Sequence, residues 1–131
     1  MTEEEKKIYI DYRIESAYKT YDAARLLADN NYWNSSVNRL YYSFFYAVNA
    51  LLFKNDIIAK SHSTTKSQFT DHFIKNGIFE KKYGRLFSQL LDWRQRGDYA
   101  NIDEYSKDMV EPLFDHVKEI IDQIKSYIYN E

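Results

Sequence analysis

The fold of this 131-residue chain is decided by residues 37–52, which have the sequence VNRLYYSFFYAVNALL. Their apolar residues recur at three- and four-residue intervals, the spacing of an α-helix, and not at alternate positions as in a strand. This spacing predicts a helix over residues 32–54. The predicted buried stripe comprises Val37, Leu40, Tyr41, Phe44, Val48, Leu51 and Leu52. Aromatic residues extend beyond that stripe, so more than one face of this helix must be buried. A helix at the centre of a bundle or at a dimer contact would meet this requirement.

Before this stretch, the sequence predicts one long helix. Thr2 and Glu5 have the spacing of a capping box, so the helix can begin almost at the N-terminus. Apolar residues then follow on one face at helical spacing, from Ile10 to Ala28. Asn30-Asn31 is the predicted break before the second helix.

After this stretch, the helical pattern lapses over residues 55–63. A shorter third helix is predicted to start near Thr64–Thr65 and to stop at Gly77, a residue suited to the end of a helix. A fourth helix follows from Phe79 to about Arg96-Gly97. Residues 98–105 are predicted to form a loop.

The last predicted helix is capped by Ser106 or Asp108, and Pro112 predicts a bend or a start nearer Asp108. Three Gly and one Pro in the whole chain leave few helix breakers. Short connections between long helices favour antiparallel neighbours. We therefore expect an all-α fold, an up-and-down antiparallel bundle of four to five helices, with residues 1–131 as a single domain.

Composition excludes several classes of protein. The chain has no Cys, which excludes disulfides, thiolate zinc sites and a cysteine nucleophile. No apolar run approaches the roughly 20 residues of a membrane span. The start of the sequence, MTEEEKK, is acidic and is not followed by a hydrophobic signal region. We expect a cytoplasmic protein with no membrane contact.

Charge is distributed unevenly around a net value of −2. Residues 54–97 hold nine Lys or Arg against four Asp or Glu, whereas residues 98–131 hold three against nine. The basic middle and the acidic tail can pair within one molecule or across a dimer. Alternatively, the basic middle can face a phosphate-bearing partner.

Motifs for metal or cofactor chemistry are absent from the sequence. It has no glycine-rich phosphate loop, no HExxH, no Glu-x-x-His pair and no nucleophile elbow. The three histidines are His62, His72 and His116, and none shares a helical face with another at ligand spacing. We expect no metal site and no cofactor.

Arg94 is the most informative single residue. It falls on the same helical stripe as Phe87, Leu90 and Leu91, so its guanidinium projects from the apolar side of the fourth helix. An unpaired charge would be costly there. Asp98, four residues later, is the nearest candidate partner. Arg94 and Asp98 therefore form either a structural clamp or one wall of an anion-binding cleft.

Two further polar sets accompany Arg94. Asn38, Arg39 and Tyr42 are neighbours on the otherwise apolar second helix and need hydrogen-bond partners there, or a ligand. His62 lies at the entry to the third helix, where the helix start with Lys60 and Lys66 can hold an anion; alternatively, His62 caps the helix or anchors the loop.

The same places carry a resemblance to a known family. They are the strings Asn38-Arg39-Leu40-Tyr41-Tyr42-Ser43, Lys60-Ser61-His62 and Arg94-Gln95-Arg96-Gly97-Asp98-Tyr99. In this order they resemble the "RxYYA", "sH" and "RxxxDY" signatures of small standalone prokaryotic members of the HEPN superfamily. The resemblance extends from about Tyr12 to Tyr127.

The resemblance implies a helical bundle that forms a homodimer, with the motif-bearing helices lining a cleft near the dimer axis. Many HEPN proteins are metal-independent ribonucleases, often toxins, that act through Arg-x(4–6)-His. Others are paired with a minimal nucleotidyltransferase or serve as binding modules. The cleft residues carried over to this sequence are Asn38, Arg39, Tyr42, His62, Arg94, Asp98 and Tyr99.

This sequence departs from the catalytic pattern, because no His follows any Arg at the required spacing and Tyr99 stands in the corresponding place. RNA cleavage without a metal needs a base for the 2′-hydroxyl and an acid for the leaving oxygen. Tyr, with a pKa of about 10, is a poor base. Arg94 can still stabilise the charge on the phosphate, and His62 is the one residue that could replace the missing base.

Three hypotheses follow. The first is a dimeric binding module, paired with a nucleotidyltransferase-type protein or binding RNA or a nucleotide, with Tyr99 as a candidate for modification. The second is a metal-independent endoribonuclease of toxin–antitoxin type with a degenerate motif. The third is an interaction scaffold with no ligand.

Overall fold

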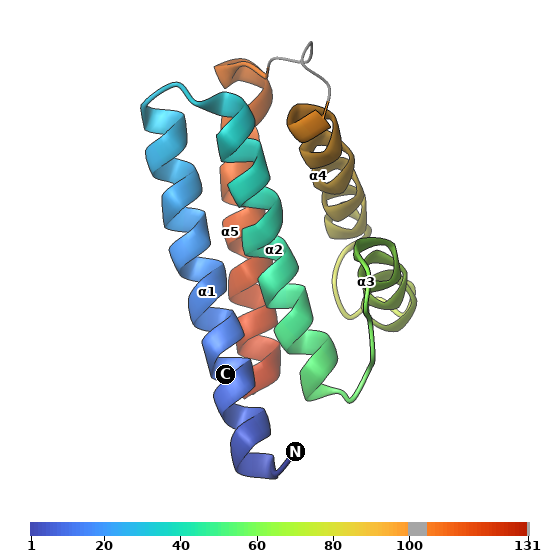
Figure 1. Ribbon diagram of the computed structural model, residues 1–131. Helices are drawn as coiled ribbons and strands as arrows, with labels where there is room; N and C mark the ends of the chain where they lie inside the picture. The colour runs from blue at the N-terminus through green and yellow to red at the C-terminus, as the bar shows by residue number, and fades with distance from the viewer. Residues whose placement is uncertain (100–104, 131) are drawn as a thin grey trace.

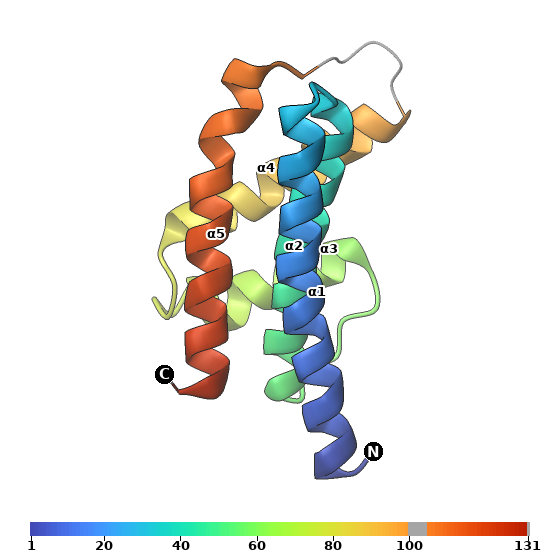
Figure 2. The same ribbon diagram turned by 90° about the vertical axis from the view of Figure 1, so that its left-hand side faces the viewer.

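The computed structural model describes residues 1–99 and 105–130, and of Tyr99 only the backbone. Five α-helices and one π-helical turn account for nearly all of these residues, and none of them lies in a strand. The elements are α1 (Glu3–Asp29), α2 (Trp33–Lys54), α3 (His62–Phe69), η1 (Thr70–Ile74), α4 (Lys81–Tyr99) and α5 (Lys107–Tyr129). Figures 1 and 2 show α1, α2 and α5 running side by side, with α4 inclined against them. The predicted all-α bundle is confirmed.

The first two helices form an antiparallel pair. Thr2 and Glu5 make the predicted capping box at the start of α1. Asn30 caps the end of the helix, and Asn31 takes a positive φ of 67°, a conformation that asparagine tolerates better than most residues. Across the pair, the buried Ser36 hydroxyl donates to the Ala24 carbonyl at 2.9 Å. The small side chains at this crossing let the two backbones approach closely.

Helix α2 is the centre of the bundle, because it packs against each of the other four α-helices. Its Phe44 ring meets the rings of Phe69 and Phe87 edge-on, with centroids 5.7 and 5.0 Å apart. All three rings are fully buried. The aromatic excess of α2 is thus explained by its central position, and the dimer contact stays a prediction. None of the described helices has the length and apolar composition required to cross a bilayer.

The third helix starts earlier than its sequence pattern predicts. It begins at His62 rather than at Thr64–Thr65, because the Ser61 hydroxyl caps it by accepting from the Thr64 N–H at 3.0 Å. The helix then widens into η1 before Gly77, which has a positive φ of 79°. The early start brings His62 onto the body of the bundle rather than leaving it in a loop.

The fourth helix ends later than predicted. It continues through Gly97 to Tyr99, so Asp98 is helical and the predicted loop does not begin there. A glycine near the end of a helical pattern usually predicts the end of the helix. Here α4 continues through Gly97, and Tyr105 and Asn34 pack closely against that glycine, as described below. In α5, Ser106 is the N-cap residue, and Pro112 lies inside the helix without ending it.

Removal of the Phe87 ring should test this aromatic core. Phe87→Ala should lower the free energy of unfolding by about 3–5 kcal/mol, because the ring is fully buried among Tyr41, Phe44 and Phe69. Ser88→Ala, at the exposed neighbouring position, should change it by less than about 0.5 kcal/mol. Urea unfolding followed by circular dichroism measures both, and equal values would contradict the packing described above.

Candidate functional site

The candidate site is centred on Arg94 of α4, which faces α2. Only 8% of Arg94 is exposed. Its guanidinium carbon lies 5.5 Å from the centre of the Tyr41 ring and 5.6 Å from that of Tyr42. The negative faces of two aromatic rings therefore supply part of the stabilisation that water would give an exposed arginine.

The ion pair of Arg94 is a loose one. The predicted partner Asp98 is present, with its Oδ2 atom 3.7 Å from Nη1 of Arg94. That separation is longer than a direct charge-assisted hydrogen bond, which is about 2.7–2.9 Å. The Nε atom of Arg94 is buried and has no hydrogen-bond partner in the described part of the chain. A buried donor without an acceptor is rare and costly, and such groups often mark the place of a ligand, ion or water.

Asp98 is shared with α2 through a hydrogen-bonded chain. The Asn38 amide nitrogen donates to Oδ2 of Asp98 at 3.0 Å. The Asn38 carbonyl oxygen in turn accepts from Nε and Nη2 of Arg39 at 3.0 and 2.7 Å. The Arg39 guanidinium also lies over the Tyr42 ring, 5.0 Å from its centre. One carboxylate thus connects two arginines, and we call this group the arginine cleft (Asn38, Arg39, Tyr42, Arg94 and Asp98).

A hollow of about 390 Å³ opens beside this chain of hydrogen bonds. Asn38, Arg39 and Asp98 line it together with Gly97 and the start of α2. Arg94 and Tyr42 lie next to the hollow rather than in its wall. Polar groups from two helices, with the positive charge of Arg39 and the negative charge of Asp98 among them, therefore line a space that is open to solvent, and Arg94 lies behind it.

His62 joins the site through Tyr41. Its Nδ1 atom lies 2.7 Å from the Tyr41 hydroxyl, and its ring packs against Phe45 with centroids 4.8 Å apart. Burial lowers the pKa of His62, and the positive charge of Arg94 lowers it further. Burial also raises the pKa of Tyr41 well above its ordinary value, although Arg94 opposes that change. At neutral pH the pair is therefore an uncharged imidazole bonded to a protonated hydroxyl.

The structure thus brings together most of the predicted site residues. Asn38, Arg39, Tyr42, Arg94 and Asp98 form one connected group, and the His62 ring meets the edge of this group at Tyr42, with centroids 5.8 Å apart. The side chain of Tyr99 lies outside the described residues. Their role in binding stays a prediction.

Tyr41 is a residue of the site that the sequence analysis did not identify as such, because its spacing predicts only that it is buried in the core. It is fully buried, but its ring lies under Arg94 and its hydroxyl meets His62. A buried tyrosine hydroxyl needs a hydrogen-bond partner, and that requirement is the signal that could have identified it.

Tyr105 holds the end of α4 in place. Its ring stacks on Trp93 with centroids 4.9 Å apart, and its hydroxyl donates to the Trp93 carbonyl at 2.8 Å. Its backbone N–H donates to the Asn34 side chain at 2.9 Å. A Cβ atom at Gly97 would lie 3.2 Å from the Tyr105 ring, so a larger residue there would push the ring away. This packing fixes the helical turn that carries Asp98.

Among the described residues, no group of three or more His, Cys, Asp or Glu side chains is arranged to hold a metal ion. The charges that the site offers to a ligand are therefore guanidinium groups and one carboxylate. Such a set suits an anion with several oxygen atoms, such as a phosphate group.

Comparison with known protein families matches residues 10–127 to the HEPN domain. A UPF0332 protein of Thermotoga maritima is 32% identical over 124 residues, which are 95% of this chain and 94% of that protein. Two proteins of Methanocaldococcus jannaschii, whose names describe them as candidate toxins, are 30% and 29% identical. They match 90% and 86% of this chain over 80% and 83% of their own length. The matched region contains the whole arginine cleft and His62.

The lowered pKa of His62 predicts how the free energy of unfolding depends on pH. The unfolded chain takes up a proton at this imidazole near its ordinary pKa of 6.5, before the folded chain does. Stability from the neutral imidazole is therefore present above that pH and is lost as the pH falls below it. Between about pH 7.5 and pH 5.5, the free energy of unfolding should decrease less in His62→Gln than in the wild type.

The matched control is His72→Gln, because His72 is exposed. That variant should show the same pH dependence as the wild type. Denaturant unfolding at several pH values measures all three proteins. A wild-type pH dependence retained in His62→Gln would contradict the buried environment of His62.

Proposed function

Because the chain belongs to the HEPN domain family, we propose that it is a toxin-type binding module that recognises a phosphate-bearing ligand, RNA or a nucleotide, in the arginine cleft. We include in this proposal a homodimeric state and a nucleotidyltransferase-type partner. Family membership supports these two parts, and the names of the two Methanocaldococcus relatives support the toxin–antitoxin context.

The observation that carries the proposal is the unpaired Nε atom of Arg94. A guanidinium that served only as a clamp would be expected to use its donors within the protein. Here the nearest carboxylate oxygen is 3.7 Å away, and Nε has no acceptor among the described residues. Arg94 lies directly behind the hollow, so an anionic oxygen that reached the buried Nε atom from there would supply the missing acceptor and a closer negative charge.

Arg39 provides the second contact. It is half-buried, lies at the edge of the hollow and is held by both its bonds to Asn38 and the Tyr42 ring. A guanidinium held in this way loses little conformational freedom on binding. Asp98 balances one of the two charges while the cleft is empty, and the remaining positive charge favours an anion.

Loss of the Arg39 charge should weaken RNA binding. We expect Arg39→Gln to raise the dissociation constant for a short fluorescent single-stranded RNA about tenfold at low salt, since one phosphate contact is lost. The slope of log affinity against log salt should also fall by roughly one unit. Fluorescence anisotropy over a range of salt concentrations measures both quantities.

Arg85→Gln is the matched control, because Arg85 is exposed on α4 and lies outside the arginine cleft. It makes the same change of charge and should leave the affinity within about twofold of the wild type. Equal losses in the two variants would mean that binding depends on net charge alone. No binding by the wild type would reject the RNA ligand and favour the scaffold hypothesis.

A second candidate function is metal-independent RNA cleavage, and the position of His62 favours it. A neutral imidazole beside a guanidinium can take a proton while the arginine stabilises charge on the phosphate. The cluster has no comparable acid, because the Tyr41 hydroxyl is buried and already bonded to His62. For this reason binding is placed first.

The cleavage function predicts that structured RNA is cut in the presence of EDTA. His62→Gln and Arg94→Ala should each reduce the rate by about 100-fold or more, since each removes a group that acts on the reacting phosphate. His116→Gln, at an exposed position on α5, should cut at the wild-type rate. Gel electrophoresis of labelled RNA follows the reaction, and cleavage that persists unchanged in Arg94→Ala would reject this function for the site.

A further inference from the structure

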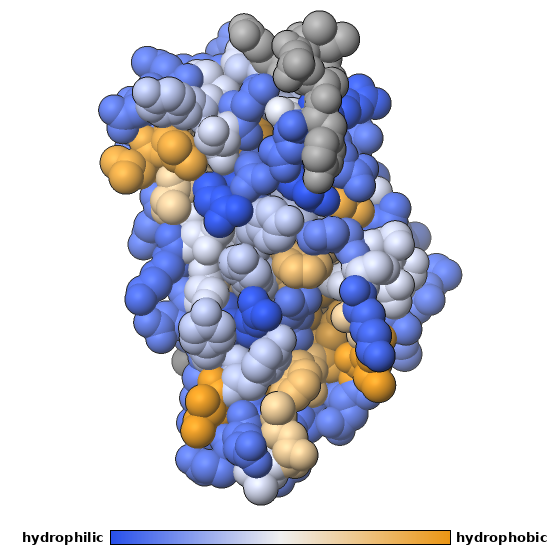
Figure 3. Space-filling view, in the orientation of Figure 1, coloured by the Kyte–Doolittle hydropathy of each residue, from blue (hydrophilic) through white to orange (hydrophobic). Residues whose placement is uncertain are grey.

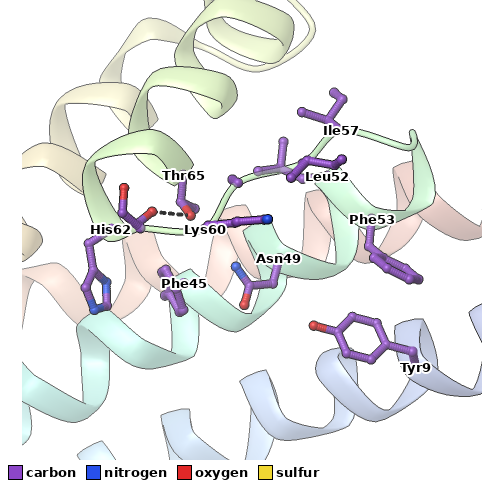
Figure 4. A pocket seen from close by; sticks show the side chains of 12 residues that line it. Tyr9, Phe45, Asn49, Leu52, Phe53, Ile57, Lys60, His62 and Thr65 are labelled. Atoms are coloured by element: carbon purple, nitrogen blue, oxygen red, sulfur yellow. Dashed lines mark hydrogen bonds between the residues drawn. The ribbon is translucent and has the colours of Figure 1, made fainter.

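A second hollow lies on the other side of His62, and the arginine cleft does not use it. It has a volume of about 310 Å³, is open to solvent on one side and is bounded by α1, α2 and the segment that leads into α3. Figure 4 shows its wall, which includes Tyr9, Phe45, Asn49, Phe53, Lys60 and His62. This volume is at the lower end of the range for small-molecule sites, about 300–1,000 Å³, and so suits one ring system rather than a large cofactor.

Aromatic rings stand on two sides of this hollow. Tyr9 and Phe53 pack together with centroids 4.4 Å apart, and Phe45 packs against His62. Tyr9, Phe45 and Phe53 are half-buried, so each keeps part of its ring available to a ligand. Rings in such an arrangement favour a flat aromatic ligand, which can stack on them.

Asn49 supplies the polar group. It lies between Phe45 and Phe53 along α2 and is half-buried. Its side chain forms no hydrogen bond within the described residues, in contrast to Asn38 on the same helix. A carboxamide offers one donor and one acceptor side by side, and that pair is complementary to the edge of a nucleobase.

We propose that this hollow, which we call the base pocket (Tyr9, Phe45, Asn49, Phe53, Lys60 and His62), binds a nucleobase of the RNA strand whose phosphate lies in the arginine cleft. The inference rests on the proposed function and specifies its ligand. The base stacks on the aromatic rings, the Asn49 amide pairs with its edge, and Lys60 is available to the backbone at the rim.

The spacing along α2 favours a strand over a mononucleotide. Arg39 lines the hollow of the arginine cleft, and Asn49 lies ten residues further on, about 15 Å along the helix axis, which is farther than one nucleotide reaches from its phosphate to its base. Successive nucleotides of a stacked strand advance by roughly 3.4 Å. The phosphate and the base therefore belong to different nucleotides. Between them, Phe45 contacts the Tyr42 ring, with centroids 5.8 Å apart, so the aromatic surface is continuous.

The outer surface is consistent with a polar ligand. Figure 3 shows this face as a mixture of strongly and weakly polar residues with small hydrophobic patches. A surface that binds a large apolar partner usually has a broader hydrophobic area.

The experiment uses two probes that separate the base pocket from the arginine cleft. Adenosine carries a base without phosphate, and ribose 5-phosphate carries phosphate without a base. Each is titrated into ¹⁵N-labelled protein, and the amide signals are followed by NMR. We expect adenosine to shift the Asn49 side-chain amide and the backbone of residues 57–65. Ribose 5-phosphate should instead shift the Nε–H signals of Arg94 and Arg39.

RNA binding then tests the link between the two sites. Asn49→Ala should weaken binding of a short single-stranded RNA about tenfold and should not change binding of an abasic strand of equal length. Phe53→Leu, which removes a ring but keeps an apolar side chain, should also weaken RNA binding. Asn76→Ala is the matched control, because Asn76 is exposed and bonds only to the nearby His72 carbonyl.

Two results would overturn the base pocket. The first is an unchanged RNA affinity in Asn49→Ala while Arg39→Gln still weakens binding, which leaves the proposed function intact. The second is the absence of any shift of the Asn49 amide signals with adenosine and with each of the other three nucleosides. That result would also be obtained if a second copy of the chain covered this face, and it would reject the base pocket in that case too. Shifts with ribose 5-phosphate but not with nucleosides would confine the ligand to the arginine cleft.

Discussion

A positive charge on the apolar side of α4 is the constraint around which the site is built. Arg94 is in register with Leu90, Leu91 and Phe87, so the helix cannot pack on α2 without burying the guanidinium. The surroundings compensate in two ways, with the faces of Tyr41 and Tyr42 and with the distant carboxylate of Asp98. Neither satisfies every donor. The bundle therefore holds a polar centre with an unsatisfied donor next to an otherwise well-packed aromatic core, a pattern typical of sites that bind a ligand.

The sequence was sufficient to predict most of the fold, because the helices are long and strongly periodic. The sequence correctly predicted the capping box of α1 and the N-cap residue of α5, but it failed at two other helix ends. The Ser61 cap starts α3 before its apolar pattern begins, and α4 continues through Gly97 because Tyr105 packs there. Both errors have one physical origin. Local sequence favours a certain end residue for a helix, but a capping or packing partner determines where the helix actually starts or stops.

The sequence also predicted part of the geometry of the candidate site. Spacing alone placed Arg94 beside Asp98 and placed Asn38, Arg39 and Tyr42 together, since all these pairs are near neighbours on a helix. It could not show that Asn38 bonds to Asp98 across sixty residues, or that Tyr41 connects Arg94 to His62. Those contacts depend on how α2, α3 and α4 meet, and this is decided by core packing rather than by the motif residues themselves.

The clamp that Tyr105 places on the end of α4 has a consequence during protein synthesis. Residues 1–99 contain every member of the arginine cleft, yet the turn that carries Asp98 is held by a residue beyond them and the core is closed only by α5. A ribosome-bound chain that has exposed only its first four helices therefore has all the chemistry of the site but not its geometry. The arginine cleft therefore takes its final geometry only after Tyr105 and α5 have been made.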